Sequence, residues 1–489
     1  EIDFNNSIIR VEPNKRKNYI ALCAYKSDNI IIRNLTLIGD VDRHLGTEGE
    51  FGFGISIIGS KNVVIDNVYA TKFWGDGIFV NSYYDNYDRD RGIIKNSSFT
   101  INNVICDDNR RQGLSILSAE DSVIKNSKFI NTGKTLFTAP GAGIDIEPED
   151  SKIHLCKNIT VDSCIFYNNK NKFDISMGHS LSQDSMIIDC IIRNSTFEKS
   201  FLIQKNTRTK IYNNTFGYNI ESNISSNVYS TRIVTCSDFT IENNTIYFST
   251  NIVGLCSGNI KNNSFYIKPR EIYVFHVNEG ADLDNLMISN NIFRIYEHTE
   301  KSQVYGFYTV STAINTPKFK YNEVTIEEGA ELRMDISNEF TNNYIQVSVN
   351  VLLSKVGKSK YNVLYNSFRG RDDDYITLYL DLENKFNEGD EINLKYNRFD
   401  YNNTHHDLFE VASTKKVKVN AFGNRLNGNP FNYMFGNILT WNINKRVGGS
   451  TDLFHQIQFD ENGKAYFIAQ YSSENINSDG TLTSKVNII

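Results

Sequence analysis

The sequence has little of what marks several large protein classes. Its 489 residues include only six prolines and two tryptophans, and no apolar run is long enough to span a bilayer. The formal net charge is −6 and Lys and Arg are scattered, so the chain has no basic patch for nucleic acid. We therefore expect no membrane insertion, no nucleic-acid binding and no cofactor. Because the chain begins at Glu1 without a charged-then-apolar leader, we expect upstream sequence to have been removed.

Cysteine is also scarce, and the number and spacing of the cysteines argue against disulfides and against a metal site. The sequence has seven cysteines but no CxxC pair and no zinc-type spacing. An odd number of cysteines in apolar, strand-like runs is typical of buried thiols. We therefore predict no disulfide and no metal site. The seven are Cys23, Cys106, Cys156, Cys164, Cys190, Cys236 and Cys256.

A short pattern recurs along most of the chain: an Asn or another polar residue, two further residues, then an apolar anchor. Asn tolerates the left-handed conformation of tight turns, and stacked amides can hydrogen-bond from coil to coil. The anchors are about 28 residues apart on average with variable intervals, which favours a β-helix over repeats of fixed length. The anchors are Leu37, Ala70, Cys106, Phe129, Phe166, Phe197, Phe216, Ile246, Phe265, Phe293, Val324, Ile345, Phe368, Phe399 and Leu426.

These repeats predict an all-β fold, a right-handed parallel β-helix over residues 1–445. The abundance of β-branched and aromatic residues agrees with pleated surfaces, and we expect the functional coils at about 35–210. The pattern stops after Trp441, although residues 446–489 keep apolar runs. An open solenoid end exposes strand edges that invite association. We therefore expect 446–489 to be a C-terminal cap or an oligomerisation segment.

The early coils share a second pattern, in which Gly is followed by alternating apolar residues. Period-two alternation places the apolar residues in the core and those between them outward on one sheet. The glycines would then leave outward backbone open to a ligand. The predicted outward rows are Ser56, Phe79, Ser115, Asp145 and Asp174, followed by Ile58, Asn81, Leu117, Glu147 and Ser176.

Three carboxylates of this face are expected within two coils. Asp145 and Glu147 are about 6.6 Å apart along a strand, and Asp174 is expected on the next strand, about 4.8 Å away. Like charges this close raise a pKa. Asp145 and Glu147 are therefore the candidate acid and base of an inverting glycosidase, with Asp76 or Asp174 assisting, whereas Asp145 with Asp174 would suit a retaining one. The alternative is a solvated acidic face that does no chemistry.

Side chains suited to carbohydrate precede these strands. Trp74 can stack on a sugar ring, and Arg110 and Arg111 can clamp a carboxylate or phosphate, unless they only pair with neighbouring surface acids. The predicted substrate-binding set is Trp74, Arg110, Arg111, His44, Glu48, Glu50, Asn81 and Phe79.

Five motifs resemble the pectate-lyase-like β-helix family, in particular phage tailspike depolymerases and pre-neck appendage proteins. They are GD at 39–40, HLGTEGEFGFGI at 44–55, FWGDGI at 73–78, NRRQG at 109–113 and GIDIEP at 143–148, within about a third of the chain. Phe51 stands where many relatives have Trp, which would alter a sugar platform. The resemblance implies a trimeric protein on the virion tail that cuts a bacterial surface polysaccharide: capsule, exopolysaccharide or teichoic acid.

Neither the fold nor the resemblance selects the reaction. Our first hypothesis is glycoside hydrolysis. A polysaccharide lyase would need a uronic acid, neutralised by Arg110, Arg111 or a cation, and a base such as His44 or a Tyr. A teichoic-acid phosphodiesterase would use the same arginines. A non-catalytic glycan-binding adhesin would bind the polymer without shortening it.

Overall fold

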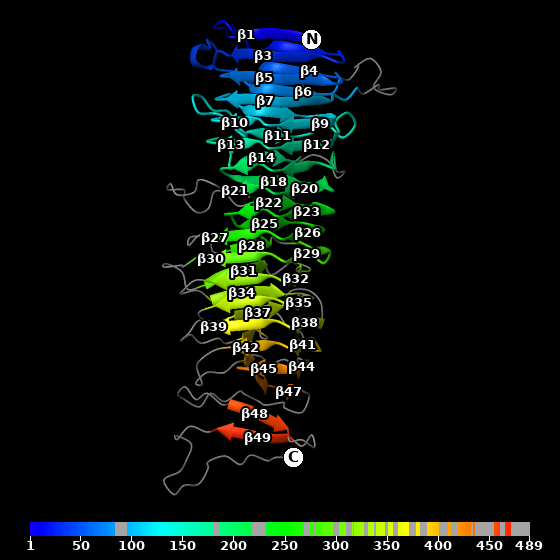
Figure 1. The fold of residues 1–489 in the computed structure, drawn as a ribbon, viewed down its shortest axis with the longest axis vertical. Helices are drawn as coiled ribbons and strands as arrows, with labels where there is room; N and C mark the ends of the chain where they lie inside the picture. The colour runs from blue at the N-terminus through cyan, green and yellow to red at the C-terminus, as the bar shows by residue number, and fades with distance from the viewer. Residues whose placement is uncertain are drawn as a thin grey trace.

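The chain is all-β, and its strands stack as rungs of one long column, with β1 (Ile2–Arg10) at one end and β49 (Ala465–Gln470) at the other (Figure 1). The structure is a computed structural model. It describes residues 1–83, 95–178, 186–217, 231–267, 273–277, 280–296, 303–309, 315, 317–326, 331–336, 339–347, 351–355, 360–370, 378–381, 389–400, 409–411, 418–431, 434–435, 454–459 and 465–470.

One sheet receives one strand from each coil, and we call it the front sheet. In the described residues it has 15 strands, all paired in parallel with the strand of the next coil. Its strands are β2 (Asn18–Tyr25), β4 (Phe51–Ile58), β6 (Asp76–Asn81), β8 (Gln112–Ile116), β11 (Ile144–Ile146), β14 (Phe173–Met177), β18 (Ser200–Gln204), β22 (Thr231–Val234), β25 (Thr250–Val253), β28 (Tyr273–Val277), β31 (Gln303–Thr309), β34 (Glu331–Ile336), β37 (Val351–Lys355), β40 (Leu378–Asp381) and β43 (Phe409–Val411).

The remaining strands of the column form a second sheet, with 32 strands in the described residues, parallel from coil to coil as far as β45. A 3-10 turn, η1 (Val41–Arg43), precedes β4. The strands are β1 (Ile2–Arg10), β3 (Ile31–Ile38), β5 (Val63–Thr71), β7 (Phe99–Asp107), β9 (Ala119–Lys125), β10 (Lys128–Ile130), β12 (Cys156–Asp162), β13 (Ile165–Tyr167), β15 (Ile187–Ile188), β16 (Ile191–Arg193), β17 (Thr196–Phe197), β19 (Asn206–Thr207), β20 (Lys210–Tyr212), β21 (Thr215–Phe216), β23 (Phe239–Glu242), β24 (Thr245–Ile246), β26 (Gly258–Lys261), β27 (Ser264–Ile267), β29 (Leu286–Ser289), β30 (Ile292–Ile295), β32 (Lys318–Lys320), β33 (Glu323–Ile326), β35 (Glu339–Thr341), β36 (Tyr344–Val347), β38 (Lys360–Leu364), β39 (Ser367–Gly370), β41 (Glu391–Lys395), β42 (Arg398–Asp400), β44 (Lys418–Phe422), β45 (Asn424–Leu426), β46 (Asn429–Phe431) and β47 (Met434–Phe435).

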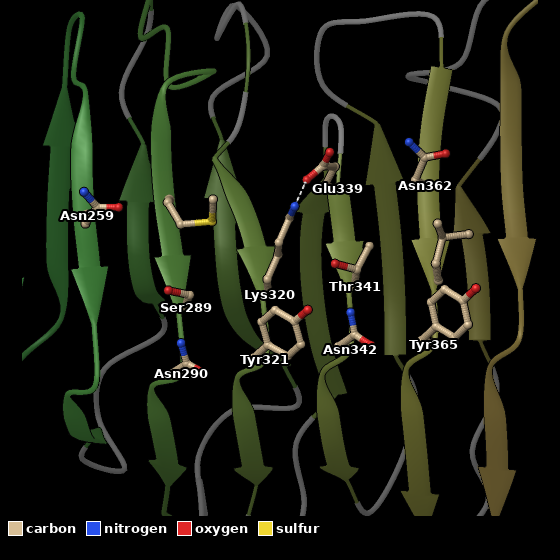
Figure 2. Close-up of a pocket in the computed structure, with 12 residues that line it drawn as sticks. Asn259, Ser289, Asn290, Lys320, Tyr321, Glu339, Thr341, Asn342, Asn362 and Tyr365 are labelled. Carbon is tan, nitrogen blue, oxygen red and sulfur yellow. Dashed lines mark ion pairs between the residues drawn. The ribbon is translucent and has the colours of Figure 1, made fainter.

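A left-handed residue lies three positions before every anchor, which confirms the turn predicted from the repeat. Its φ ranges from 52° at Asn67 to 67° at Gly423. The residue is Asn in most coils, because Asn adopts this conformation at little cost. Two of the exceptions are visible in Figure 2. The exceptions are Ser163, Tyr321, Tyr365, Tyr396 and Gly423.

Directly after this residue, a column of buried asparagines runs through the later coils, and we call it the amide spine. Asn244 Nδ2 donates to Asn263 Oδ1 at 3.0 Å and to the carbonyl of Ile211 at 2.9 Å. Its Oδ1 accepts from Asn214 Nδ2 at 3.0 Å. The predicted stacking of amides is therefore present, chiefly one residue further along the chain. The spine is Asn214, Asn244, Asn263, Asn291, Asn322, Asn343, Asn366, Asn397 and Asn424.

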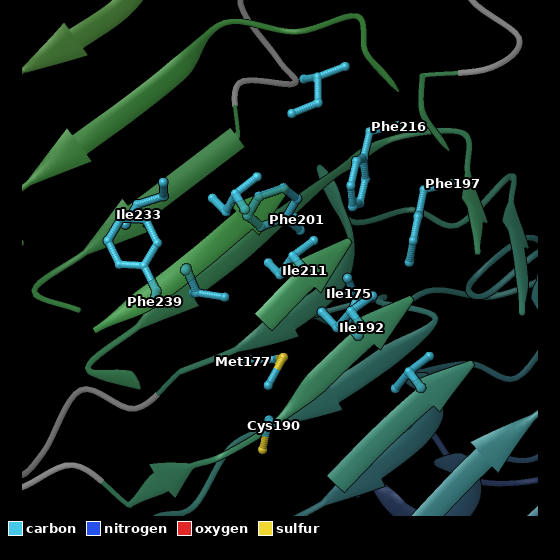
Figure 3. Close-up of a cluster of buried hydrophobic side chains, with 14 of the residues drawn as sticks. Ile175, Met177, Cys190, Ile192, Phe197, Phe201, Ile211, Phe216, Ile233 and Phe239 are labelled. Atoms are coloured by element: carbon cyan, nitrogen blue, oxygen red, sulfur yellow. The ribbon is translucent and has the colours of Figure 1, made fainter. Parts of the chain in front are cut away.

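The core is a ladder of stacked apolar side chains between the sheets. Phe197 stacks on Phe166 with ring centroids 4.4 Å apart and on Phe216 at 4.6 Å, and Figure 3 shows Phe197, Phe216 and the neighbouring isoleucines in this interior. All seven cysteines are free and six are buried, the exception being Cys23. The prediction of buried thiols without disulfides agrees with this.

Beyond β47, the structure describes an antiparallel hairpin of β48 (Phe454–Phe459) and β49 (Ala465–Gln470). It lies past the last coil in Figure 1. The rest of 446–489 lies outside the described residues, so the role of this segment as a cap or trimerisation element stays a prediction. In the part of the chain that the structure describes, no helix is long and apolar enough to cross a membrane.

Candidate functional site

The outward rows of the front sheet follow the predicted facing in the early coils. Ile144 and Ile146 are fully buried in the core, so Asp145 between them faces outward. Asp145 pairs with Ser115, which pairs with Phe79. The next row begins with Ile58 beside Asn81, as expected.

The predicted position of Asp174 was wrong by two residues. Asp145 pairs with Ser176, whereas Asp174 lies beside Gly143. Asp174 is fully buried, its Oδ1 accepts from Asn169 Nδ2 at 2.8 Å, and its Oδ2 accepts from the backbone N–H of Lys199 at 2.7 Å. These bonds close a turn, so Asp174 forms no retaining pair with Asp145.

The glycines before the outward row do not face a ligand, which corrects the second expectation. A Cβ at Gly143 would lie 2.7 Å from the ring of Phe166, and one at Gly113 would lie 3.0 Å from the ring of Phe129. A side chain at either glycine would therefore point into the core, and the side chain of the apolar residue that follows each glycine does the same. The chain needs glycine here because the strand approaches the core aromatics too closely for a side chain.

Because two successive residues face inward, the side chains before the glycines emerge on the outward face. There Asp76 Oδ2 accepts from Arg111 Nη1 at 2.9 Å, and Gln112 Nε2 donates to Asp145 Oδ2 at 2.8 Å. Asp145 and Glu147 both act electrostatically on Arg111. We call Asp76, Arg111, Gln112, Asp145 and Glu147 the acidic cluster. It joins three coils, through β6, β8 and the end of β11.

Burial sets the protonation of the acidic cluster. Burial, reinforced by Glu147, raises the pKa of Asp145 to about 7, although Ser176 and Arg111 oppose the rise. Burial also raises the pKa of Asp76 to about 7, against the effect of Arg111. The pKa of half-buried Glu147 is raised by burial and lowered in part by Arg111. Burial therefore favours the protonated form of these carboxyls near neutral pH.

An exposed aromatic ring borders the acidic cluster. Phe51 is 47% exposed, and the Arg111 guanidinium lies 5.9 Å from its ring centroid. Phe79 stacks on Phe53 at 4.4 Å and is half-buried. Arg111 Nε also lies 3.9 Å from Glu50 Oε2. A sugar ring could therefore rest on Phe51 beside the carboxyls.

Trp74 does not form the predicted sugar platform, because both faces of its indole are covered. The imidazole of His44 stacks on it at 3.8 Å, and the Arg110 guanidinium lies 3.8 Å from the ring centroid. Trp74 is only 3% exposed. His44 Nδ1 lies 2.7 Å from Asp40 Oδ2, and Tyr19 O–H donates to the same carboxylate at 2.6 Å.

Three predicted binding residues, Trp74, His44 and Arg110, cover one another in this stack and therefore do not contact a ligand on the outward face. Arg110 Nη1 donates to the carbonyl of Gly49 at 2.7 Å, which ties the loop of 44–50 to the third coil. Glu48 pairs with Lys17 on the surface and does not reach the acidic cluster. Asn81 accepts from the backbone N–H of Ser82 at 2.7 Å and remains half-exposed in its row.

The prediction missed Gln112, placed Ser176 in the outward row beside Glu147 where the structure pairs it with Asp145, and named Phe51 only as a change to a sugar platform. Gln112 immediately precedes a core-facing glycine, as Asp76 does, and this shared position is the signal that could have identified it. Among the described residues, no group of three or more His, Cys, Asp or Glu side chains is placed to hold a metal ion.

No protein-family model matches the chain. The uncharacterized protein YclG of Bacillus subtilis (strain 168) is 34% identical over 152 residues, which is 29% of this chain and 25% of YclG. The SPbeta prophage-derived uncharacterized protein YorA of the same strain is 28% identical over 176 residues, which is 33% of this chain and 29% of YorA. The similarity thus spans less than a third of either relative, and one of the two relatives derives from a prophage.

Proposed function

We propose that the chain is a phage or prophage depolymerase that hydrolyses glycosidic bonds of a bacterial surface polysaccharide at the acidic cluster. The observation that carries this is the pair of Asp145, buried with a pKa of about 7, and Glu147 on the same outward face. The parallel β-helix and the prophage-derived relative support the phage origin. A place on the virion tail, a homotrimer, and capsule, exopolysaccharide or teichoic acid as substrate belong to the same proposal.

In this mechanism protonated Asp145 is the general acid and ionised Glu147 the general base. Glu147 takes a proton from water, whose oxygen bonds to the anomeric carbon while the glycosidic C–O bond breaks. The proton of Asp145 passes to the leaving oxygen. Residues i and i+2 of a strand are about 6.6 Å apart, which is within the range that leaves room for water and inverts the configuration. Gln112 orients Asp145, and Arg111, held by its bond to Asp76, places its positive charge beside both carboxyls.

The geometry favours hydrolysis over β-elimination. A lyase needs a cationic group free to neutralise the uronate and a base that reaches the sugar. Arg110 is stacked on Trp74 and bonded to Gly49, and Arg111 is paired with Asp76. His44 is buried beneath Trp74 and bonded to Asp40. A teichoic-acid phosphodiesterase would need the same two arginines, and both are engaged in these contacts.

The test is cleavage of purified Bacillus subtilis exopolysaccharide and wall teichoic acid by the full chain, with products identified by mass spectrometry. Asp145→Asn and Glu147→Gln should each lower the rate by about 10²–10⁴-fold, the usual contribution of acid–base catalysis. Glu149→Gln is the matched control, because Glu149 is an exposed acid two residues further on. It should keep the rate within about twofold.

The pH profile and the products separate the alternatives. Activity should fall about tenfold per unit as the pH rises above about 7, because Asp145 then loses the proton that it must donate. Full activity in both variants would refute the acidic cluster as the catalytic site. Unsaturated uronide products would indicate a lyase and phosphomonoesters a phosphodiesterase. Binding without any shortening of the polymer would indicate an adhesin.

A further inference from the structure

A groove of about 630 Å³ lies on the second sheet in the later coils (Figure 2). Its walls come from β26, β29, β32, β35 and β38 and from the turns that follow them. The acidic cluster is on the front sheet and in earlier coils, so the two places are separate. The groove is lined by Asn259, Met287, Ser289, Asn290, Lys320, Tyr321, Glu339, Thr341, Asn342, Asn362, Leu364 and Tyr365.

Two tyrosines dominate the exposed surface of the groove. Tyr321 is 57% exposed and Tyr365 is 54% exposed. Both occupy the left-handed corner position, with φ of 56° and 58°, where most other coils have Asn. A bulky residue is rare in this conformation because of steric strain, and such strain points to a role for the side chain outside the fold.

The backbone behind the tyrosines is held firmly. Asn322 and Asn366, the residues that follow them, are members of the amide spine. Asn366 Nδ2 donates to Asn397 Oδ1 at 3.0 Å and to the carbonyl of Phe340 at 2.8 Å. The ring of Tyr396 stacks on Tyr365 with centroids 4.9 Å apart and 9° between the planes. The rings therefore stand on a rigid support, which lowers the entropic cost of binding.

Polar groups between the rings suit a sugar better than a protein surface. Lys320 Nζ and Glu339 form an ion pair with each other, so this pair adds no net charge to the groove. Asn290, Asn342 and Asn362 offer amides, which both donate and accept and so match hydroxyl groups. The aromatic faces match the apolar C–H faces of sugar rings.

The exposed side chains of the groove are spaced along the axis of the column. Tyr321, Asn342 and Tyr365 take the same corner position in three consecutive coils. Neighbouring strands are about 4.8 Å apart, so the two tyrosines are about 9.6 Å apart along the axis. A glycan chain that follows the axis can place separate sugar units on the two rings, with the Asn342 amide between them.

We propose that this groove is a second, non-catalytic binding site for an uncharged stretch of a glycan chain, with Tyr321 and Tyr365 as its stacking platforms. The inference goes beyond the proposed hydrolysis, because binding here needs no bond cleavage. If both proposals hold, the groove anchors the polymer while the acidic cluster cuts another part of it. Two weak sites on one polymer raise the overall affinity through effective concentration.

The test uses the double variant Tyr321→Asn/Tyr365→Asn in the full chain. Asn is the native residue at this corner in most coils, so the variant should fold. Affinity electrophoresis in gels that contain Bacillus subtilis exopolysaccharide should show roughly tenfold weaker retention than for the wild-type chain. Tyr247→Asn is the matched control, because Tyr247 is a half-exposed stacked tyrosine outside the groove. Its retention should stay within about twofold of wild type.

The outcomes distinguish the groove from the catalytic proposal. Unchanged retention of the double variant would overturn the groove, as would a wild-type chain that the exopolysaccharide does not retain. A double variant with unchanged retention but an altered molar mass in light scattering would assign the tyrosines to contact between copies and overturn the glycan site. Cleavage of short exopolysaccharide fragments is measured separately. Tyrosine-dependent retention without any cleavage would leave the groove standing and refute only the hydrolase.

Discussion

The early and the late coils of the β-helix bury their polar side chains at different positions of the coil. In the first three coils the position after the left-handed turn is apolar, at Leu35, Val68 and Val104, and a group of buried polar side chains lies on the front sheet as the acidic cluster. In the later coils that position is the amide spine. The early coils thus carry buried acids with raised pKa values, while the later coils carry satisfied amides that favour rigidity.

The largest expected effect comes from breaking the amide spine. Asn263→Leu would deprive the backbone N–H of Asn244 and the carbonyl of Ile241 of their partners. Each buried unsatisfied group costs about 1–3 kcal/mol, so for the two groups we expect a loss of about 2–6 kcal/mol in unfolding free energy. Urea unfolding measures it. Asn262→Gly is the control, because Asn262 is exposed and Gly accepts its left-handed backbone. Equal midpoints for the two variants would show that the spine does not stabilise the late coils.

The second prediction contrasts two buried aspartates within the early coils. Asp174 accepts N–H donors at both oxygens, so Asp174→Asn turns an amide group toward a donor and should cost about 1–3 kcal/mol. Asp145→Asn can keep its oxygen toward Gln112 and should leave stability unchanged or higher at pH 8. Thermal unfolding of the two variants at one pH checks this. A destabilised Asp145→Asn would make Asp145 a structural residue.

The fold could be predicted from the sequence because its causes are local. The left-handed corner, the apolar anchor three residues later and the facing of Ile144 and Ile146 all follow from short-range patterns. The spacing between the corner residue and the anchor does not depend on coil length, so the pattern can be recognised although the loops vary in length. The buried side of the coil could thus be identified without any knowledge of contacts.

The site could be predicted only in part because its contacts join distant segments. Trp74 has the composition of a sugar platform, but His44 and Arg110 approach it from 30 and 36 residues away and cover it. The predicted position of Asp174 was wrong because the turn that begins at Asn169 extends into the strand. The glycines broke the period-two rule, and this moved Asp76 and Gln112 onto the outward face. Asp145 and Glu147 were placed correctly because they lie after the irregular stretch.

The third prediction concerns pH and tests whether the buried acid of the early coils makes their stability fall as the pH rises. Asp145 has a folded-state pKa of about 7, above its ordinary 3.8, so its proton binds more tightly in the folded chain. The stabilisation is full below about pH 3.8 and is lost as the pH rises to about 7, at about 1.4 kcal/mol per unit. The unfolding free energy of Asp145→Asn should therefore fall less steeply than that of the wild-type chain over this window. Parallel curves would exclude a buried, protonated Asp145.

The smallest expected effect comes from exchanging corner residues between the two halves. Tyr321→Asn relieves the left-handed strain of a bulky residue and should raise the unfolding free energy by about 1 kcal/mol. Tyr365→Asn should gain less, because it also loses the stack on Tyr396. The reciprocal Asn103→Tyr introduces the strain in an early coil and removes an amide bond to Asn67, so it should cost about 1 kcal/mol or more. Urea midpoints measured side by side would give the order Tyr321→Asn, Tyr365→Asn, wild type, Asn103→Tyr. If Tyr321→Asn instead lowers the midpoint, the ring stabilises the fold, and its strain can no longer be attributed to a ligand.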